Sequence, residues 1–261
     1  MKGNKMEISL ATKMDIPQLK NLWQACFFDD NSTINMFFDT CFSPCNTVVA
    51  KCEGKIVSAF YLIDATLIID EKEYKSAYIY AAATLSDYRK KGIMSELLSF
   101  SEELCKKGNY DFQFLAPASN NLFDYYSKNG FKDGFFKKDI ILNYNELEFL
   151  NINEKYNFVR WNNDAIELSK KYQGINYKNS VNFMTIQKKD GIINSVLILN
   201  NSNSIENAKR YLLENFKSCD FRISVPANFS YNCKIERVGM IKPLKAFNKD
   251  FSNIYMGLTL A

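Results

Sequence analysis

The chain has 261 residues, of which 47% are hydrophobic and 24% charged, so it suits one large domain or two modest ones with a substantial core. It has no histidine, which excludes Ser-His-Asp and Cys-His hydrolases and leaves a carboxylate, a tyrosine, a terminal group or water as general base. The net charge of +4 is uneven: residues 1–150 carry 17 basic and 20 acidic side chains, and residues 151–261 carry 16 and 9.

The seven cysteines are scattered and odd in number, which does not indicate a disulfide framework. Cys41 and Cys45 have a ligand-like spacing, but no second pair follows, so we expect free thiols and no metal. No stretch resembles a signal peptide or a membrane span. We therefore expect a cytoplasmic protein without membrane contact. The dispersed basic residues of the second half do not favour nucleic acid as a partner.

The first half alternates predicted strands and helices. Asp15 is placed to cap a helix that has Pro17 in its first turn, and apolar residues then recur at three-to-four spacing. Glu53-Gly54 indicates a tight hairpin turn. The pattern predicts strands at 7–11, 47–52, 55–63, 74–85 and 111–116, helices at 16–27, 32–42, 93–107 and 122–128, and a final strand pair ending near Leu142.

This order predicts an α/β fold with a mixed, partly parallel sheet flanked by helices. The Asn-rich segment 143–154 is interpreted as a linker, so we expect domains at residues 1–145 and 155–261. The second half is expected to be a smaller α/β unit, and its order suggests a degenerate repeat of the first. Its predicted elements are a strand at 157–161, a helix at 163–172, a hairpin across 188–191, a helix at 205–216 and a strand at 219–225.

The segment from Ala83 to Leu98 carries the clearest chemical signal. A strand ends, a cationic turn follows at residues 89–91, and a helix opens at Gly92. Unpaired N–H groups at a helix start, together with the helix dipole, form an anion cradle that suits a pyrophosphate. Gly92 lets the backbone approach such a ligand closely. The alternative is a solvated basic turn in front of an amphipathic helix.

This segment resembles motif A of the GNAT superfamily, in which Arg89, Gly92 and Met94 occupy the pattern positions. Met94 departs from the small residue that is usual there. Downstream, Tyr126 lies four residues before a Gly-Phe dipeptide, as in motif B of the same superfamily. The two motifs, with a predicted strand between them, identify residues 1–145 as similar to acyl-CoA-dependent N-acyltransferases.

The resemblance implies a sheet split between its fourth and fifth strands, with the pantetheine arm of acetyl-CoA paired to the fourth strand. It also implies that Tyr126 is the catalytic acid that protonates the departing thiolate. The expected cofactor-binding residues are Ala83, Thr84, Leu85, Arg89, Lys90, Lys91, Gly92, Ile93, Met94, Ser95, Asn120 and Asn121.

The general base stays open between Tyr80 and Asp87, each acting through water. Two-domain relatives of the enhanced-intracellular-survival type, to which the chain is distantly similar, use their C-terminal carboxylate. The terminal segment 256–261 is therefore a further candidate if it folds inward.

Three carboxylates, Asp29, Asp30 and Asp39, fall in or beside the segment joining the first two helices, which borders the acceptor entrance in this family. Their negative potential favours a cationic acceptor, such as a polyamine, an aminoglycoside-like amine or a lysine side chain. The alternative is a solvated acidic loop.

The sequence thus predicts an N-acetyltransferase that acts on a primary amine of a small molecule or peptide. The competing interpretation is a non-catalytic acyl-CoA sensor or scaffold. A third is an aminoacyl transferase using charged tRNA, which the basic second half permits and the CoA-type turn opposes. No basic turn with glycine precedes residues 205–216, so we expect the second half not to bind CoA. It is expected instead to cover the acceptor side of the cleft or to form a homodimer contact.

Overall fold

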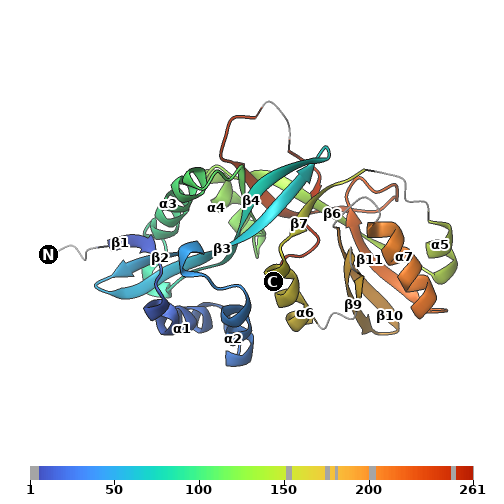
Figure 1. Cartoon of the computed structure of the whole chain (residues 1–261), viewed down its shortest axis with the longest axis horizontal. Coiled ribbons are helices and arrows are strands. Elements are labelled where there is room, and N and C mark those ends of the chain that lie inside the picture. The colour runs from blue at the N-terminus through green and yellow to red at the C-terminus, as the bar shows by residue number, and fades with distance from the viewer. Residues whose placement is uncertain are drawn as a thin grey trace.

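The computed structural model describes residues 6–150, 155–173, 177–179, 182–199, 204–247 and 251–260. Within these residues one mixed sheet of thirteen strands runs through both halves of the molecule, with helices packed against it (Figure 1). The predicted α/β fold with a partly parallel sheet is confirmed. In the described part of the chain, no helix has the length and apolar character needed to cross a membrane.

The first half follows the predicted order closely. Its strands are β1 (Met6–Leu10), β2 (Thr47–Cys52), β3 (Lys55–Ile69), β4 (Lys72–Thr84) and β5 (Phe112–Leu115). Its helices are α1 (Ile16–Phe27), α2 (Asn31–Thr40), α3 (Ile93–Lys107) and α4 (Asn120–Lys128). Neighbouring strands from β1 to β4 pair antiparallel, and β4 runs parallel to β5 because α3 provides the crossover between them.

The two faces of this sheet bury different helices. Side chains alternate along a strand, so Phe60 and Ile79 pack with α3 and α4, whereas Tyr61 and Tyr78 pack in the cluster that holds α1 and α2. Because both faces are covered, β3 is apolar over most of its length rather than alternating with polar residues. The second half contributes Trp161 to the α1–α2 side, so that part of the core is shared between the halves.

The rest of the chain, from residue 132 onward, adds the remaining elements. They are β6 (Lys132–Leu142), α5 (Tyr144–Phe149), β7 (Asn157–Trp161), α6 (Asn163–Gln173), β8 (Tyr177–Asn179), β9 (Asn182–Lys189), β10 (Ile192–Ile198), α7 (Ser204–Asn215), β11 (Asp220–Pro226), β12 (Ile235–Pro243) and β13 (Ile254–Tyr255). The predicted linker at 143–154 is wrong over α5, because Asn143 and Glu146 form a reciprocal capping box that starts a helix. Residues 151–154 lie outside the described residues.

The predicted local strand pair ending near Leu142 is also wrong, because β6 is a single strand with distant partners. It pairs with β11 on one side and with β12 on the other, and β12 lies between β5 and β6. Gly239, at a bulge in β12, makes this insertion possible: a Cβ there would lie 2.8 Å from the Leu115 carbonyl oxygen. The sheet is therefore continuous from the strands of the first predicted domain to those of the second. The division into two domains stays a prediction.

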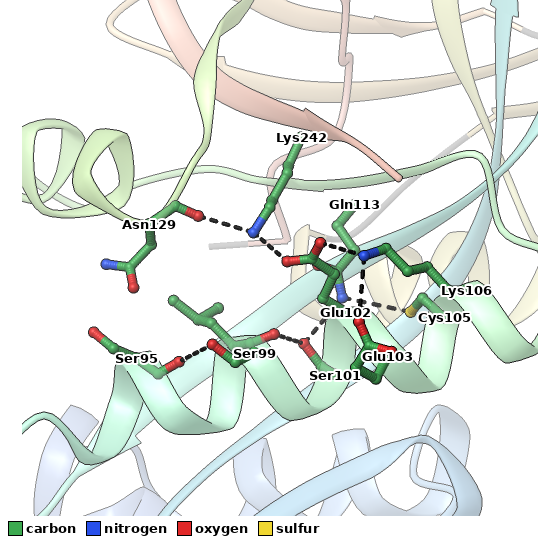
Figure 2. A network of polar contacts seen from close by, with 11 residues as sticks. Ser95, Ser99, Ser101, Glu102, Glu103, Cys105, Lys106, Gln113, Asn129 and Lys242 are labelled. Carbon is green, nitrogen blue, oxygen red and sulfur yellow. Dashed lines mark hydrogen bonds and ion pairs between the residues drawn. The ribbon is translucent and has the colours of Figure 1, made fainter. Parts of the chain in front are cut away.

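A polar network fastens β12 to the helices of the first half (Figure 2). Lys242 donates to Glu102 of α3 at 2.5 Å and to the backbone oxygen of Asn129 at the end of α4 at 3.0 Å. Glu102 also pairs with Lys106 at 2.8 Å. Burial opposes the charged form of Glu102, but its bonds to Lys106 and Lys242 outweigh this and hold its pKa below the usual value. A strand of the second half thus fixes the relative positions of α3 and α4.

Candidate active site

The candidate site lies where β4 and β5 separate. The two strands pair at only three positions, the last joining Tyr78 to Phe114, although β4 continues to Thr84. Beyond the last pair, β4 carries a bulge, since Ala81 and Ala82 both lie opposite Phe60 of β3. Ala81 has a φ of 48°, a left-handed conformation that is uncommon for a residue with a side chain. The backbone of β4 from residue 79 onward therefore borders an open gap.

A cavity of about 560 Å³ lies in this gap, beside the cationic turn. Its walls come from the end of α1, the end of β4, the turn, the start of α3 and the middle of α4. The lining residues are Cys26, Phe27, Ala82, Ala83, Thr84, Tyr88, Arg89, Lys90, Gly92, Ile93, Met94, Leu122, Tyr125 and Tyr126.

The turn leads directly into α3. Lys90 and Gly92 have positive φ values of 60° and 79°, a left-handed backbone conformation that occurs in anion-binding turns. Arg89 donates from Nε to the Thr84 carbonyl oxygen at 2.9 Å, which fixes the start of the turn to the end of β4. Apart from its immediate chain neighbours, no described residue comes within 4 Å of a Cβ built on Gly92, so the space beside this glycine is open.

Seven of the twelve predicted cofactor residues line this cavity: Ala83, Thr84, Arg89, Lys90, Gly92, Ile93 and Met94. The other five, Leu85, Lys91, Ser95, Asn120 and Asn121, are not among its lining residues. Ser95 instead shares a hydrogen bond of 3.0 Å with Tyr125, which does line the cavity. The sequence analysis did not predict that Tyr125 and the end of α1 line this cavity, because no local pattern indicates that α1 and α4 meet at the split.

A second cavity, of about 450 Å³, opens on the α1–α2 side of the same split. It is lined by Trp23, Phe27, Asp29, Thr33, Tyr78, Ile79, Tyr80, Ala81, Ala82, Leu115, Ala116, Pro117, Ala118, Leu122, Tyr126, Tyr172, Thr259 and Leu260. The second half thus contributes a residue of α6 and two residues near the C-terminal end to its wall. That the second half covers the acceptor side of the cleft stays a prediction.

The two cavities meet around Tyr126. Phe27, Ala82, Leu122 and Tyr126 line both of them. Only 7% of Tyr126 is exposed, and burial, with a smaller contribution from Tyr125, raises the pKa of its phenol well above the usual value of 10. Tyr126 therefore keeps its proton at any physiological pH.

The candidate bases differ in their position relative to the second cavity. Tyr80 lines the second cavity, but burial raises its pKa, so the phenol stays neutral and is a poor base. Asp87 is exposed, accepts a hydrogen bond from Ser86 at 3.2 Å and lines neither cavity. The C-terminal segment folds inward, since the Tyr78 hydroxyl donates to the Thr259 carbonyl oxygen at 2.6 Å. Ala261, with the predicted terminal carboxylate, lies outside the described residues.

The three predicted rim carboxylates lie in different surroundings. Asp30 caps α2 by accepting from the backbone N–H of Thr33 at 2.7 Å, and Asp39 is exposed. Only Asp29 lines the second cavity, where it accepts a hydrogen bond from the Trp23 indole at 2.8 Å. Among the residues that the structure describes, no group of three or more histidine, cysteine or carboxylate side chains is arranged to hold a metal ion.

Comparison with protein families decides what this split sheet is. Residues 7–133 match the family model described as an acetyltransferase (GNAT) domain. The chain carries a GNAT acetyltransferase domain. The predicted resemblance and the expected class, an acyltransferase, are thereby confirmed. The matched residues run from β1 to the start of β6 and include the split, the turn and Tyr126.

Solved structures show how far the fold is shared. The chain is similar to Eis1 from Mycobacterium abscessus (7% identity, TM-score 0.70, covering 92% of this chain and 74% of that one). It is also similar to GCN5-related N-acetyltransferases from Anabaena variabilis (11%, 0.68, 92% and 73%) and Kribbella flavida (11%, 0.65, 91% and 70%). At these identities the likeness shows the fold, and it extends beyond the GNAT domain into the second half. No curated protein matches the chain significantly.

Proposed function

We propose that the protein transfers an acetyl group from acetyl-CoA to a primary amine of a small molecule or peptide. The observation that supports this most is the meeting of two cavities at Ala82 and Tyr126. One cavity has a cationic turn at its edge, and the other is largely aromatic with a single carboxylate. A donor and an acceptor entering from opposite sides would thus meet beside a protonated phenol.

The first cavity fits the parts of CoA in order. The start of α3, with Arg89 and Lys90 before it, suits the pyrophosphate, because a helix start offers unpaired N–H groups and the two side chains add positive charge. The open backbone of β4 at Ala83 and Thr84 offers hydrogen-bonding groups to a pantetheine arm lying alongside, in the manner of an added strand. The thioester would then lie near Ala82 and Tyr126.

The residues at the junction supply what amide formation needs. The amine nitrogen attacks the thioester carbonyl carbon, a C–N bond forms and the C–S bond breaks. A backbone N–H of the bulged segment would stabilise the charge that develops on the carbonyl oxygen. Tyr126 gives its proton to the departing sulfur and is reprotonated from solvent, while the proton lost by the amine leaves through water. Loss of the general acid typically costs about 10²–10⁴-fold in rate.

The cofactor assignment is tested by changing charge at one position. Asp and Asn are nearly isosteric and both tolerate the left-handed backbone of Gly92, so Gly92→Asp and Gly92→Asn differ mainly in charge. Calorimetry should show acetyl-CoA binding about 100-fold weaker in Gly92→Asp than in Gly92→Asn, because like charges placed together cost several kcal/mol. Adding Arg89→Ala to Gly92→Asp should abolish binding. Equal affinities in the Asp and Asn variants would contradict a pyrophosphate at this turn.

Catalysis is tested separately by following the release of free CoA thiol with a panel of amines. Amine-dependent release supports the proposed transferase. Tight acetyl-CoA binding without release for any amine would favour the sensor or scaffold interpretation instead.

A further inference from the structure

The second cavity has an unusual wall for a site that must admit a charged molecule. Six aromatic side chains line it, together with several aliphatic ones. Among its described lining residues Asp29 alone carries a charge. Its aromatic residues are Trp23, Phe27, Tyr78, Tyr80, Tyr126 and Tyr172.

Asp29 lacks a cationic partner in the part of the chain that the structure describes. The Trp23 indole donates to one of its carboxylate oxygens at 2.8 Å, and no described lysine or arginine forms a salt bridge with it. Burial raises the pKa of Tyr172 to about 12 and also that of Tyr80, and the charge of Asp29 adds to both shifts. The carboxylate therefore exerts its field across the cavity.

We propose, on the basis of the function proposed above, that the acceptor is a small monoamine carried on an aromatic or branched aliphatic body. One carboxylate matches one ammonium group, and aromatic ring faces attract the same cation. The rest of the wall gains by removing apolar surface of the acceptor from water. Asp29 and the rings capture the ammonium form, which then loses a proton to water before attack.

Two tyrosine hydroxyls of the wall are already hydrogen-bonded to backbone carbonyl oxygens of the same wall. The Tyr78 hydroxyl donates to the Thr259 carbonyl oxygen, and the Tyr172 hydroxyl donates to that of Thr33 at 3.2 Å. A polyhydroxylated amine or a linear polyamine would bring several further polar groups into this wall, and each buried group left unpaired lowers affinity by roughly tenfold or more. An α-amino acid would place its own carboxylate in the field of Asp29. The structure thus favours an apolar acceptor over the polyamine or aminoglycoside-like amine that the sequence suggested.

Amine binding tests this inference without requiring turnover. Calorimetry on CoA-saturated protein would compare 2-phenylethylamine and 3-methylbutylamine with spermidine, kanamycin and glycine. We expect either apolar monoamine to bind at least about tenfold more tightly than each of the other three. Tighter binding of spermidine, kanamycin or glycine would overturn the inference. Thiol release with any amine would still support the transferase, so the two proposals fail separately.

Two neighbouring carboxylates provide a matched pair of variants. Asp29→Asn and Asp30→Asn remove the same charge one residue apart, and asparagine preserves the cap that Asp30 gives to α2. We expect Asp29→Asn to weaken binding of 2-phenylethylamine about tenfold, with the loss persisting at high salt because the site is partly buried. Asp30→Asn should change it less than about twofold. Equal effects in the two variants would overturn the role assigned to Asp29.

Discussion

Two regions of the molecule share the same strand–helix–strand arrangement but differ at the seam between their strands. In the first half β4 and β5 run parallel across α3, and their pairing stops after three positions. In the second half β10 and β11 run parallel across α7, and they stay paired over five positions from Ile192 to Val196 without a register shift. The first seam opens into two cavities, whereas the second is covered by a cluster that includes Ile193 and Leu212.

The difference between the two seams lies in the backbones of β4 and β5. The bulge at Ala81 and Ala82 and the shortness of β5, which ends at Leu115, leave β4 without a partner where the cavities lie. Within the residues that the structure describes, the ladder between β10 and β11 is regular. That the second half does not bind CoA stays a prediction. Residues 200–203, which precede α7, lie outside the described residues.

The largest expected effect concerns Tyr126, which lies at the mouth of the open seam. Tyr126→Phe removes the hydroxyl and preserves the ring that packs against Phe131. We expect turnover to fall about 10²–10⁴-fold, as for loss of a general acid, with little change in the Michaelis constant for acetyl-CoA. Steady-state thiol release measures both quantities. Tyr144→Phe provides a control that should leave most of the turnover, because it removes a tyrosine hydroxyl that lines neither cavity.

The pH profile gives this prediction a second readout. Because burial raises the pKa of Tyr126, the wild-type rate should rise with pH as the amine loses its proton and should show no descending limb up to about pH 10. Normal turnover in Tyr126→Phe, or a rate that falls between about pH 7 and 9, would show that Tyr126 is not the acid.

An effect on stability is expected where the second half holds the open seam in place. Lys242→Met keeps the length of the side chain but removes its bonds to Glu102 and to the Asn129 carbonyl oxygen (Figure 2). We expect the free energy of unfolding to fall by about 1–3 kcal/mol at neutral pH, since a hydrogen bond to a charged group contributes this much. Denaturant unfolding measures the change.

Lys106→Met is the matched control, because it removes the more exposed partner of the same carboxylate and should cost much less. The pKa of Glu102 is lowered in the folded state, so its contribution is present above the unfolded value of about 4.3 and is lost as pH falls through the folded one. The gap between the two variants should therefore narrow below about pH 4. A gap that is constant with pH would show that the bond to Glu102 does not account for the effect.

The sequence predicts local features of this fold far better than distant pairings. The helix at 93–107 and the turn at Glu53-Gly54 were correctly predicted, because apolar periodicity and turn residues act within a few positions. The pairing of β12 with β5 was not predicted. More than 120 residues separate the paired residues, and no pattern in residues 235–243 indicates which strand they pair with. Likewise the motifs indicate the cationic turn, but only the folded chain brings Asp29 and Tyr172 to one cavity.

The smallest expected effect tests the cause of the open seam itself. An alanine in the left-handed region costs roughly 1–2 kcal/mol, a penalty that glycine avoids. Ala81 has a φ of 48°, so Ala81→Gly should be neutral or should stabilise by up to about 1 kcal/mol, although glycine normally weakens a strand. Ala77→Gly, at a buried position of the same strand in regular pairing, should destabilise by about 1 kcal/mol.

Thermal and denaturant unfolding of the two glycine variants, with calorimetry of acetyl-CoA, would settle the comparison. Affinity for acetyl-CoA should survive in Ala81→Gly, because glycine adopts the same bulge without strain. If Ala81→Gly loses as much stability as Ala77→Gly, the bulge is not strained. The separation of β4 from β5 would then have to come from the shortness of β5 and the insertion of β12 beside it. If instead Ala81→Gly is neutral or stabilising, Ala81 is strained. The strain then lies where β4 separates from β5, as expected for a strained conformation that is retained for function.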